Sequence, residues 1–89
     1  MNLIKIDHIV SGEIDNPDNP PGIESDYINL NNVASITPII YQDDSGKMDY
    51  TINIAYTSGD NARLDVPPWV YDSVMAWLDS AVVFSGDML

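Results

Sequence analysis

Alternating apolar and polar residues predict β-strands along most of this chain. The clearest pattern lies at 50–56, where Tyr and Ile side chains alternate with Thr, Asn and Ala. Similar alternation at 3–10 and at 62–66 predicts two further strands. Because successive side chains of a strand point to opposite faces, each of these strands should present one apolar face to a common core.

Between these strands lie two less regular apolar segments and two turn signals. The stretch 27–30 is short, and 33–41 predicts a strand that contains Pro38. Proline cannot donate a ladder hydrogen bond, so this strand should lie at a sheet edge or carry a bulge. The segments 42–48 and 58–61 are rich in Asp, Ser, Asn and Gly and predict hairpin turns.

A helix is predicted after Pro67 and Pro68, because proline suits the first helical turn, where its missing N–H costs nothing. Apolar side chains then recur at helical spacing and form one broad stripe: Val70, Tyr71, Val74, Met75, Trp77, Leu78 and Ala81. This stripe should cover a sheet. Residues 82–89 contain Gly86 and could form a helix cap, a short added strand or a tail.

The segment 11–26 has a different composition, with three prolines, two glycines, two asparagines and five acidic residues. This composition predicts a long polar loop, with Ile14 and Ile23 as its apolar anchors. The fold class predicted for residues 1–89 is therefore a single acidic α+β domain. It should hold a small antiparallel sheet of four or five strands, with one C-terminal helix packed on one face.

Composition excludes several classes of protein. The chain has no cysteine, which removes disulfide frameworks, thiol nucleophiles and thiolate metal sites. Its first residues lack the apolar core and cleavage site of a secretory signal, and no apolar run approaches the length of a membrane span. We therefore expect a cytoplasmic protein without a membrane partner, in the host cytoplasm if a phage encodes it.

Charge is the strongest functional signal. Fourteen acidic residues face three basic ones, which gives a net charge of -11, and most of the acids are Asp, whose short side chain holds its charge near the backbone. Such a protein should be repelled by nucleic acid, so direct nucleic-acid binding is not expected.

Candidate catalytic residues are few. His8 is the only histidine, and the pattern of residues 3–10 places it on the apolar face together with Ile4, Ile6 and Val10. We expect a hydrogen-bonded core histidine, with a general base or a metal ligand as the alternatives. One histidine supplies no Ser-His-Asp constellation, and no phosphate-binding glycine loop is present. No enzyme activity, catalytic residue or cofactor is predicted.

A weak calcium site is the alternative function of the segment Asp15–Glu24, whose carboxylates and amides are suitable calcium ligands. The prolines in this segment break the alternate spacing that an EF-hand loop requires, so a polar loop is favoured and no metal site is predicted. Trp69, Tyr71 and Trp77 suggest a stacking platform for bases, but their helical spacing favours a place in the core, with Trp69 partly exposed.

The charge predicts a protein that imitates a polyanion. A net charge of -11 equals that of about 19 Å of duplex DNA, close to the size of a domain this small. In size, acidity and lack of cysteine the chain resembles small phage inhibitors of restriction enzymes and of CRISPR complexes. That resemblance implies an anti-defence inhibitor that blocks a basic nucleic-acid-binding protein or complex. The predicted partner-binding residues are Asp43, Asp44, Asp49, Asp60, Asp65, Asp72, Asp79 and Trp69.

Two other interpretations stay open. Surplus Asp could serve solubility alone. The chain could also be an accessory or assembly domain that pairs through a sheet edge or its aromatic helix. The assembly interpretation predicts an exposed apolar patch near Trp69, Tyr71 or residues 82–84. Charge mimicry instead predicts that the acidic residues gather on one or two faces, whereas solubility predicts that they scatter.

Overall fold

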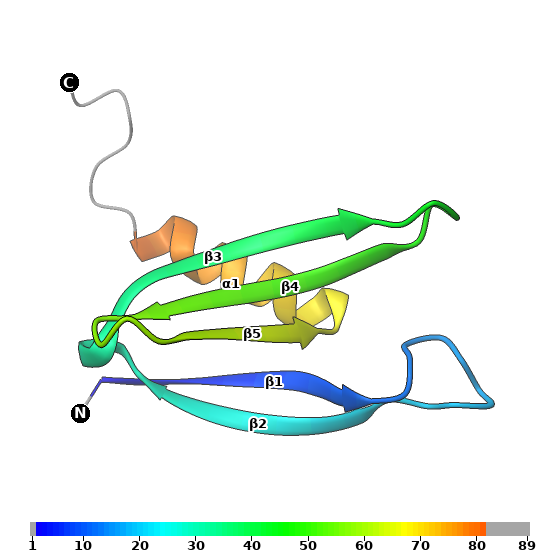
Figure 1. Cartoon of the computed structure of the whole chain (residues 1–89), viewed down its shortest axis with the longest axis horizontal. Coiled ribbons are helices and arrows are strands. Elements are labelled where there is room, and N and C mark those ends of the chain that lie inside the picture. Colours follow the sequence, from blue (N-terminus) through cyan, green and yellow to red (C-terminus); the bar gives the residue numbers. More distant parts are fainter. Residues whose placement is uncertain (1, 82–89) are drawn as a thin grey trace.

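The computed structural model describes residues 2–81 and confirms the predicted α+β class. Five strands, a short 3-10 helix and one C-terminal helix follow one another along the chain (Figure 1). They are β1 (Leu3–Ser11), β2 (Gly22–Asn29), η1 (Leu30–Asn32), β3 (Val33–Gln42), β4 (Met48–Tyr56), β5 (Asn61–Val66) and α1 (Pro68–Ala81).

The strands divide between two antiparallel sheets, a division that the alternation pattern does not reveal. One sheet has two strands in the order β1-β2, and the other has three in the order β3-β4-β5. Figure 1 shows β1 beside β5, and α1 behind the three-stranded sheet. Within the described residues no ladder joins β1 to β5, so these two strands meet through their side chains.

The core lies between the three-stranded sheet, β1 and α1. Ile52 and Ile54 of β4 have no exposed surface, and they face Val74, the most buried residue of the helix. Tyr71 of α1 packs against Tyr50 of β4, with ring centroids 5.2 Å apart. The buried cluster consists of Ile6, Ile28, Ile52, Ile54, Leu64, Val66 and Val74. The predicted strand and helix faces therefore meet in one core.

The predicted edge and helix start are both confirmed. Pro38 lies in β3, an edge strand of its sheet, where the missing donor is tolerated. Helix α1 begins at Pro68, and the carbonyl of Pro67 accepts hydrogen bonds from the N–H groups of Val70 and Tyr71. The proline pair therefore ends β5 and starts the helix, as the sequence predicts.

The polar loop expected over 11–26 is shorter, because β1 extends to Ser11 and β2 begins at Gly22. The two strands pair as a ribbon along this polar stretch, and Ile9 lies opposite Ile23. The remaining connection is tightly folded. Gly12 has φ of 70°, and a Cβ added there would lie 2.1 Å from the carbonyl oxygen of Pro20. Only glycine fits so close an approach of two backbone segments.

Candidate partner-binding site at the acidic end

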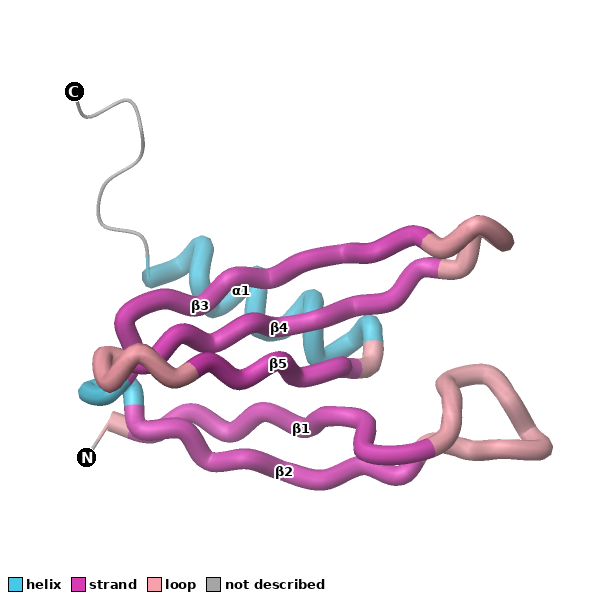
Figure 2. The backbone as a smooth tube through the Cα atoms, viewed as in Figure 1, coloured by secondary structure: helices cyan, strands magenta, loops and turns pink. Residues whose placement is uncertain are grey.

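Two hairpin loops project at the same end of the elongated molecule, which measures 48 × 30 × 22 Å. They are the β1–β2 loop (12–21) and the β3–β4 loop (43–47) (Figure 1, Figure 2). An ion pair joins them, with 3.6 Å between Lys47 Nζ and Glu13 Oε2. Acidic residues far apart in sequence are thereby brought together.

Seven carboxylates belong to this region, which we call the acidic end. All seven side chains are exposed, and they make up half of the acidic residues of the chain. The acidic end consists of Glu13, Asp15, Asp18, Asp43, Asp44, Asp49 and Asp65. The β1–β2 loop contributes the first three, the β3–β4 loop the next two, and β4 and β5 one each.

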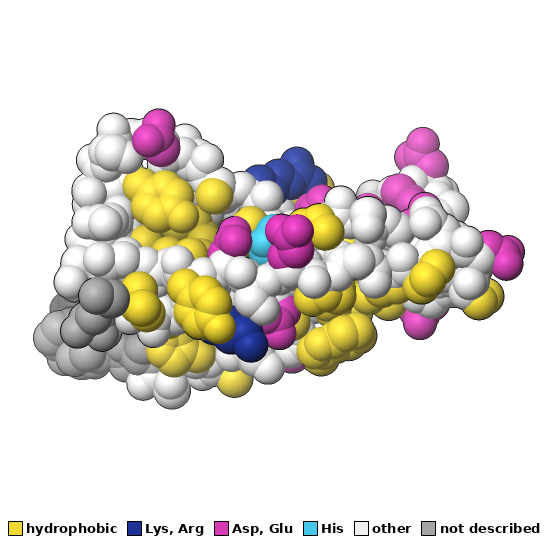
Figure 3. Space-filling view, turned by 90° about the horizontal axis from the view of Figure 1, so that it is seen from below, with side chains coloured by type: hydrophobic (Ala, Val, Ile, Leu, Met, Phe, Trp, Pro, Cys, Tyr) yellow, Lys and Arg dark blue, Asp and Glu magenta, His cyan; other side chains and the backbone are white. Residues whose placement is uncertain are grey.

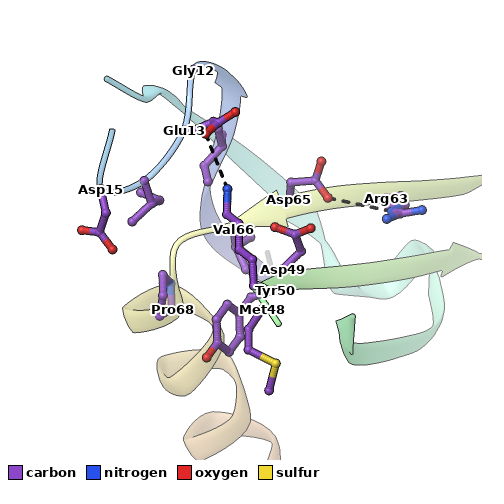
Figure 4. Close-up of a pocket in the computed structure, with 13 residues that line it drawn as sticks. Gly12, Glu13, Asp15, Met48, Asp49, Tyr50, Arg63, Asp65, Val66 and Pro68 are labelled. Carbon is purple, nitrogen blue, oxygen red and sulfur yellow. Dashed lines mark ion pairs between the residues drawn. The ribbon is translucent and has the colours of Figure 1, made fainter. Parts of the chain in front are cut away.

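A cavity of about 490 Å³ lies between the β1–β2 loop and the sheet. Figure 4 shows Glu13 and Asp15 on the loop side, and Asp49 and Asp65 on the side of β4 and β5. Pro68, at the start of α1, also lines it. Four of the seven carboxylates thus line one concave surface.

The two basic residues at this cavity are both held by carboxylates. Lys47 pairs with Glu13, and Arg63 Nε lies 3.8 Å from Asp65 Oδ1 while its guanidinium stacks 4.8 Å from the Tyr41 ring centroid. The same Asp65 oxygen accepts a hydrogen bond from the buried Thr51 hydroxyl. These pairs leave five carboxylates of the acidic end without an ion pair to any described residue: Asp15, Asp18, Asp43, Asp44 and Asp49.

Asp43 organises the β3–β4 loop in addition to carrying charge. Its Oδ1 accepts hydrogen bonds from the Ser45 hydroxyl, the Ser45 N–H and the Lys47 N–H. The Ser45 hydroxyl has the largest effect and, with the Lys47 N–H, holds the pKa of Asp43 below its ordinary value. Asp43 is therefore a turn residue, and its neighbour Asp44 is the better candidate for direct partner contact.

The structure gathers only some of the predicted partner-binding residues. Asp43, Asp44, Asp49 and Asp65 belong to the acidic end. Asp60 lies in the β4–β5 turn at the opposite end of the sheet, beside the Ser58 hydroxyl. Asp72 and Asp79 are exposed on α1, and Trp69, with 61% of its surface exposed, lines a separate groove between β1 and α1.

Sequence reasoning missed Glu13, Asp15 and Asp18, which belong to the segment interpreted as a polar loop. Because β1 pairs with β2, the loop between them lies at one end of a hairpin. No local pattern tells whether this end faces the β3–β4 loop, since that depends on how the hairpin packs against β5 and α1. The sequence shows that these three residues are charged, but it does not show where in the fold they lie.

Acidic residues outside the acidic end are interspersed with other side chains. Figure 3, which views the molecule from the β2 side, shows acidic side chains on this face separated by apolar and neutral groups, some of them beside the histidine. His8 Nε2 lies 3.3 Å from Asp26 Oδ2, and the side chain is largely buried. The apolar face predicted for residues 3–10 extends to His8 but not to Val10, which is exposed beyond the limit of the core.

Metal chemistry receives no geometric support from residues 2–81, where no three His, Cys, Asp or Glu side chains are placed to share a metal ion. In the segment considered for calcium, Asn16 Oδ1 instead accepts the Asp18 N–H, and Glu24 lies in β2. In the same range of the chain, no helix has the length and apolar character needed to cross a membrane.

No family model matches the chain, and neither a curated protein nor a solved structure is found to match it.

Proposed function

We propose that this protein is a small acidic inhibitor that imitates the charge of nucleic acid and blocks a basic nucleic-acid-binding site on a protein partner. The phage-type anti-defence proteins, directed against CRISPR or restriction complexes, are the class it fits. One observation carries the proposal: two hairpin loops and two strands place seven exposed carboxylates at one end, against two cations that are already paired.

The spacing of the acidic end suits a cationic groove. Thr51 of β4 pairs with Asp65 of β5. Asp49 lies two residues before Thr51 and points to the same side, so Asp49 and Asp65 lie on the same face of neighbouring strands. Such diagonal neighbours are about 7–8 Å apart. Rows of Lys and Arg that bind a phosphate backbone can therefore reach successive carboxylates. The mechanism needs no catalysis, because occupation of the groove excludes the nucleic acid.

Opposite charges also determine the kinetics. Attraction between the acidic end and a basic groove should raise the association rate and make it fall steeply with ionic strength. Such an inhibitor acts in the cytoplasm, where its target binds DNA or RNA.

Capture from a nuclease-treated bacterial lysate tests the proposal. The tagged protein should retain a nucleic-acid-binding protein at low salt, release most of it at about 0.5 M salt, and release it at low salt when a DNA duplex is added. Failure to retain any nucleic-acid-binding protein contradicts the proposal. So does a retained protein that the duplex fails to displace.

A second candidate function, an accessory or assembly domain, is favoured by the exposure of Trp69. This side chain lines a groove of about 450 Å³ with Trp77 of α1 and Ile4 of β1. Tyr71, by contrast, packs on Tyr50, and residues 82–84 lie outside the described part of the chain. Partner capture that resists 0.5 M salt and is lost in Trp69→Ala would favour assembly over charge mimicry.

A further inference from the structure

Within residues 2–81, strand β2 has one edge without a partner strand. It pairs with β1 along one side only, and Figure 1 shows no described element beyond its other side. The free row of backbone groups on such an edge can pair with an extended segment of another chain.

The register of the hairpin identifies the backbone groups that point outward. The N–H of Leu30 donates to the carbonyl of Asn2, so this pair and every second pair after it bond across the ladder. The intervening residues of β2 then direct their N–H and C=O groups away from β1. They are Ile23, Ser25, Tyr27 and Asn29, of which the first three are exposed.

The side chains along this edge define what fits it. Glu24 and Asp26 point to one face of the hairpin and Ile23 and Tyr27 to the other, because neighbouring residues alternate. Ile23 is 44% exposed and Tyr27 is 67% exposed. An incoming strand therefore meets two carboxylates on one face and two apolar side chains on the other.

A second copy of this chain fits the edge badly. In an antiparallel self-pair centred on Ser25, Glu24 of each copy would lie directly opposite Asp26 of the other copy. Like charges at facing positions oppose pairing, and here the repulsion occurs twice.

Among the described residues, β1 and β5 lie beside each other, so the edge of β3 is the other sheet edge with no strand next to it, and it offers less. Pro38 removes one donor from the middle of β3, and Val33–Gln42 carries no charged residue. Strand β2 thus combines a continuous row of backbone groups with charge that selects a partner.

We propose that the free edge of β2 binds an extended basic segment of a partner protein as an added antiparallel strand. Lys or Arg side chains of that segment lie opposite Glu24 and Asp26, and apolar side chains lie opposite Ile23 and Tyr27. The edge is a surface separate from the acidic end, so the inference does not rest on the proposed function. Where both hold, one basic partner contacts both surfaces.

A synthetic peptide, acetyl-Val-Lys-Val-Arg-Val-Lys-Val-amide, tests this pairing by NMR titration. With basic residues opposite Glu24 and Asp26, the valines occupy the hydrogen-bonded positions. Methylation of the inner valine N–H groups should weaken binding about tenfold, because two or more hydrogen bonds are lost. Methylation of the backbone N–H groups of Lys and Arg instead leaves the charge and size of the peptide similar. It should change the affinity less than about twofold.

Amide hydrogen exchange gives a second measurement on the same complex. Saturating peptide should slow exchange at Ile23, Ser25 and Tyr27 about tenfold or more, and change Glu24 and Asp26 little, since their N–H groups already bond to β1. Equal affinity of the two methylated peptides, no binding of the unmodified one, or protection confined to other strands would overturn the proposal.

Variants separate this surface from the acidic end. Glu24→Gln with Asp26→Asn should weaken peptide binding about tenfold, whereas Asp44→Asn with Asp49→Asn removes the same charge and should weaken it less than about twofold. Equal losses in the two variants would mean that the peptide responds to net charge alone. The proposed function is tested separately, by displacement of a partner with duplex DNA. A failure of peptide binding would therefore not contradict it.

Discussion

Lys47 and Glu13 meet at 3.6 Å and join the tips of two hairpins that belong to different sheets. Both side chains are about half exposed. The pair holds the β1–β2 and β3–β4 loops against one cavity and neutralises one carboxylate of the acidic end.

Lys47→Gln should therefore have different effects on stability and on binding. The free energy of unfolding should change by less than about 1 kcal/mol, because exposed ion pairs contribute little. Affinity for a basic partner should rise about threefold at low salt, since the acidic end gains one uncompensated charge. Chemical denaturation and a binding titration measure the two effects. Weaker binding would show instead that Lys47 contacts the partner or that its pairing positions the loops.

Asp43→Ala should destabilise the β3–β4 loop in a pH-dependent way. The hydrogen bonds from Ser45 and Lys47 lower the pKa of Asp43, so its carboxylate stabilises the folded state above the ordinary carboxyl pKa. This contribution is lost as pH falls through the lowered pKa. Denaturation at neutral pH should show a less stable variant, and the difference should shrink in acid. Asp44→Ala is the matched control, and a pH-independent difference in Asp43→Ala contradicts the assignment.

Salt should stabilise the fold, because a net charge of -11 repels itself in the compact state. Raising NaCl from about 0.02 M to 0.5 M shortens the screening length severalfold. We expect Tm to rise by about 5 °C, which corresponds to about 1 kcal/mol for a domain of this size. A variant with Asp44, Asp49, Asp72 and Asp79 changed to Asn should show a smaller rise. A Tm that does not respond to salt would mean that the repulsion is already relieved.

Ile52→Ala should remove a large share of the total stability. Ile52 has no exposed surface and lies between Pro38 and Leu64 on the face covered by α1. Truncation of such a side chain costs about 2–5 kcal/mol. Ile40→Ala, on the same face but 42% exposed, should cost less than about 1 kcal/mol. Thermal or chemical denaturation measures both losses of stability. Similar losses in the two variants would contradict the placement of Ile52 in the core.

The fold class was predictable because the strongest patterns are local. Alternation over Tyr50–Tyr56, turn residues on either side of it and the proline pair before α1 each specify one element. The division into two sheets was not predictable, since β1 approaches β5 through side chains and no local pattern encodes that packing. The apolar stretch at 27–30 indicated only the last part of β2, because the polar residues Glu24, Ser25 and Asp26 pair with β1 without being buried.

The candidate site was predictable only in its charge. Asp43, Asp44 and Asp49 share one hairpin, so sequence alone places them together. Asp60 is also exposed but lies at the far end of β4, a consequence of strand direction. Glu13 joins the acidic end through the packing of one sheet against the other, which acts over a long separation in the chain.

Two charge-matched variants test most directly whether the position of the carboxylates matters. Asp44→Asn with Asp49→Asn removes two charges from the acidic end and leaves Asp43 in its turn, and Asp72→Asn with Asp79→Asn removes two from α1. The measurement is displacement of a labelled DNA duplex from the captured partner at low salt. We predict that the first variant needs about tenfold more protein for half displacement and the second less than about twofold more. Equal changes in the two variants, or no displacement by the unaltered protein, would contradict imitation of nucleic acid by the acidic end.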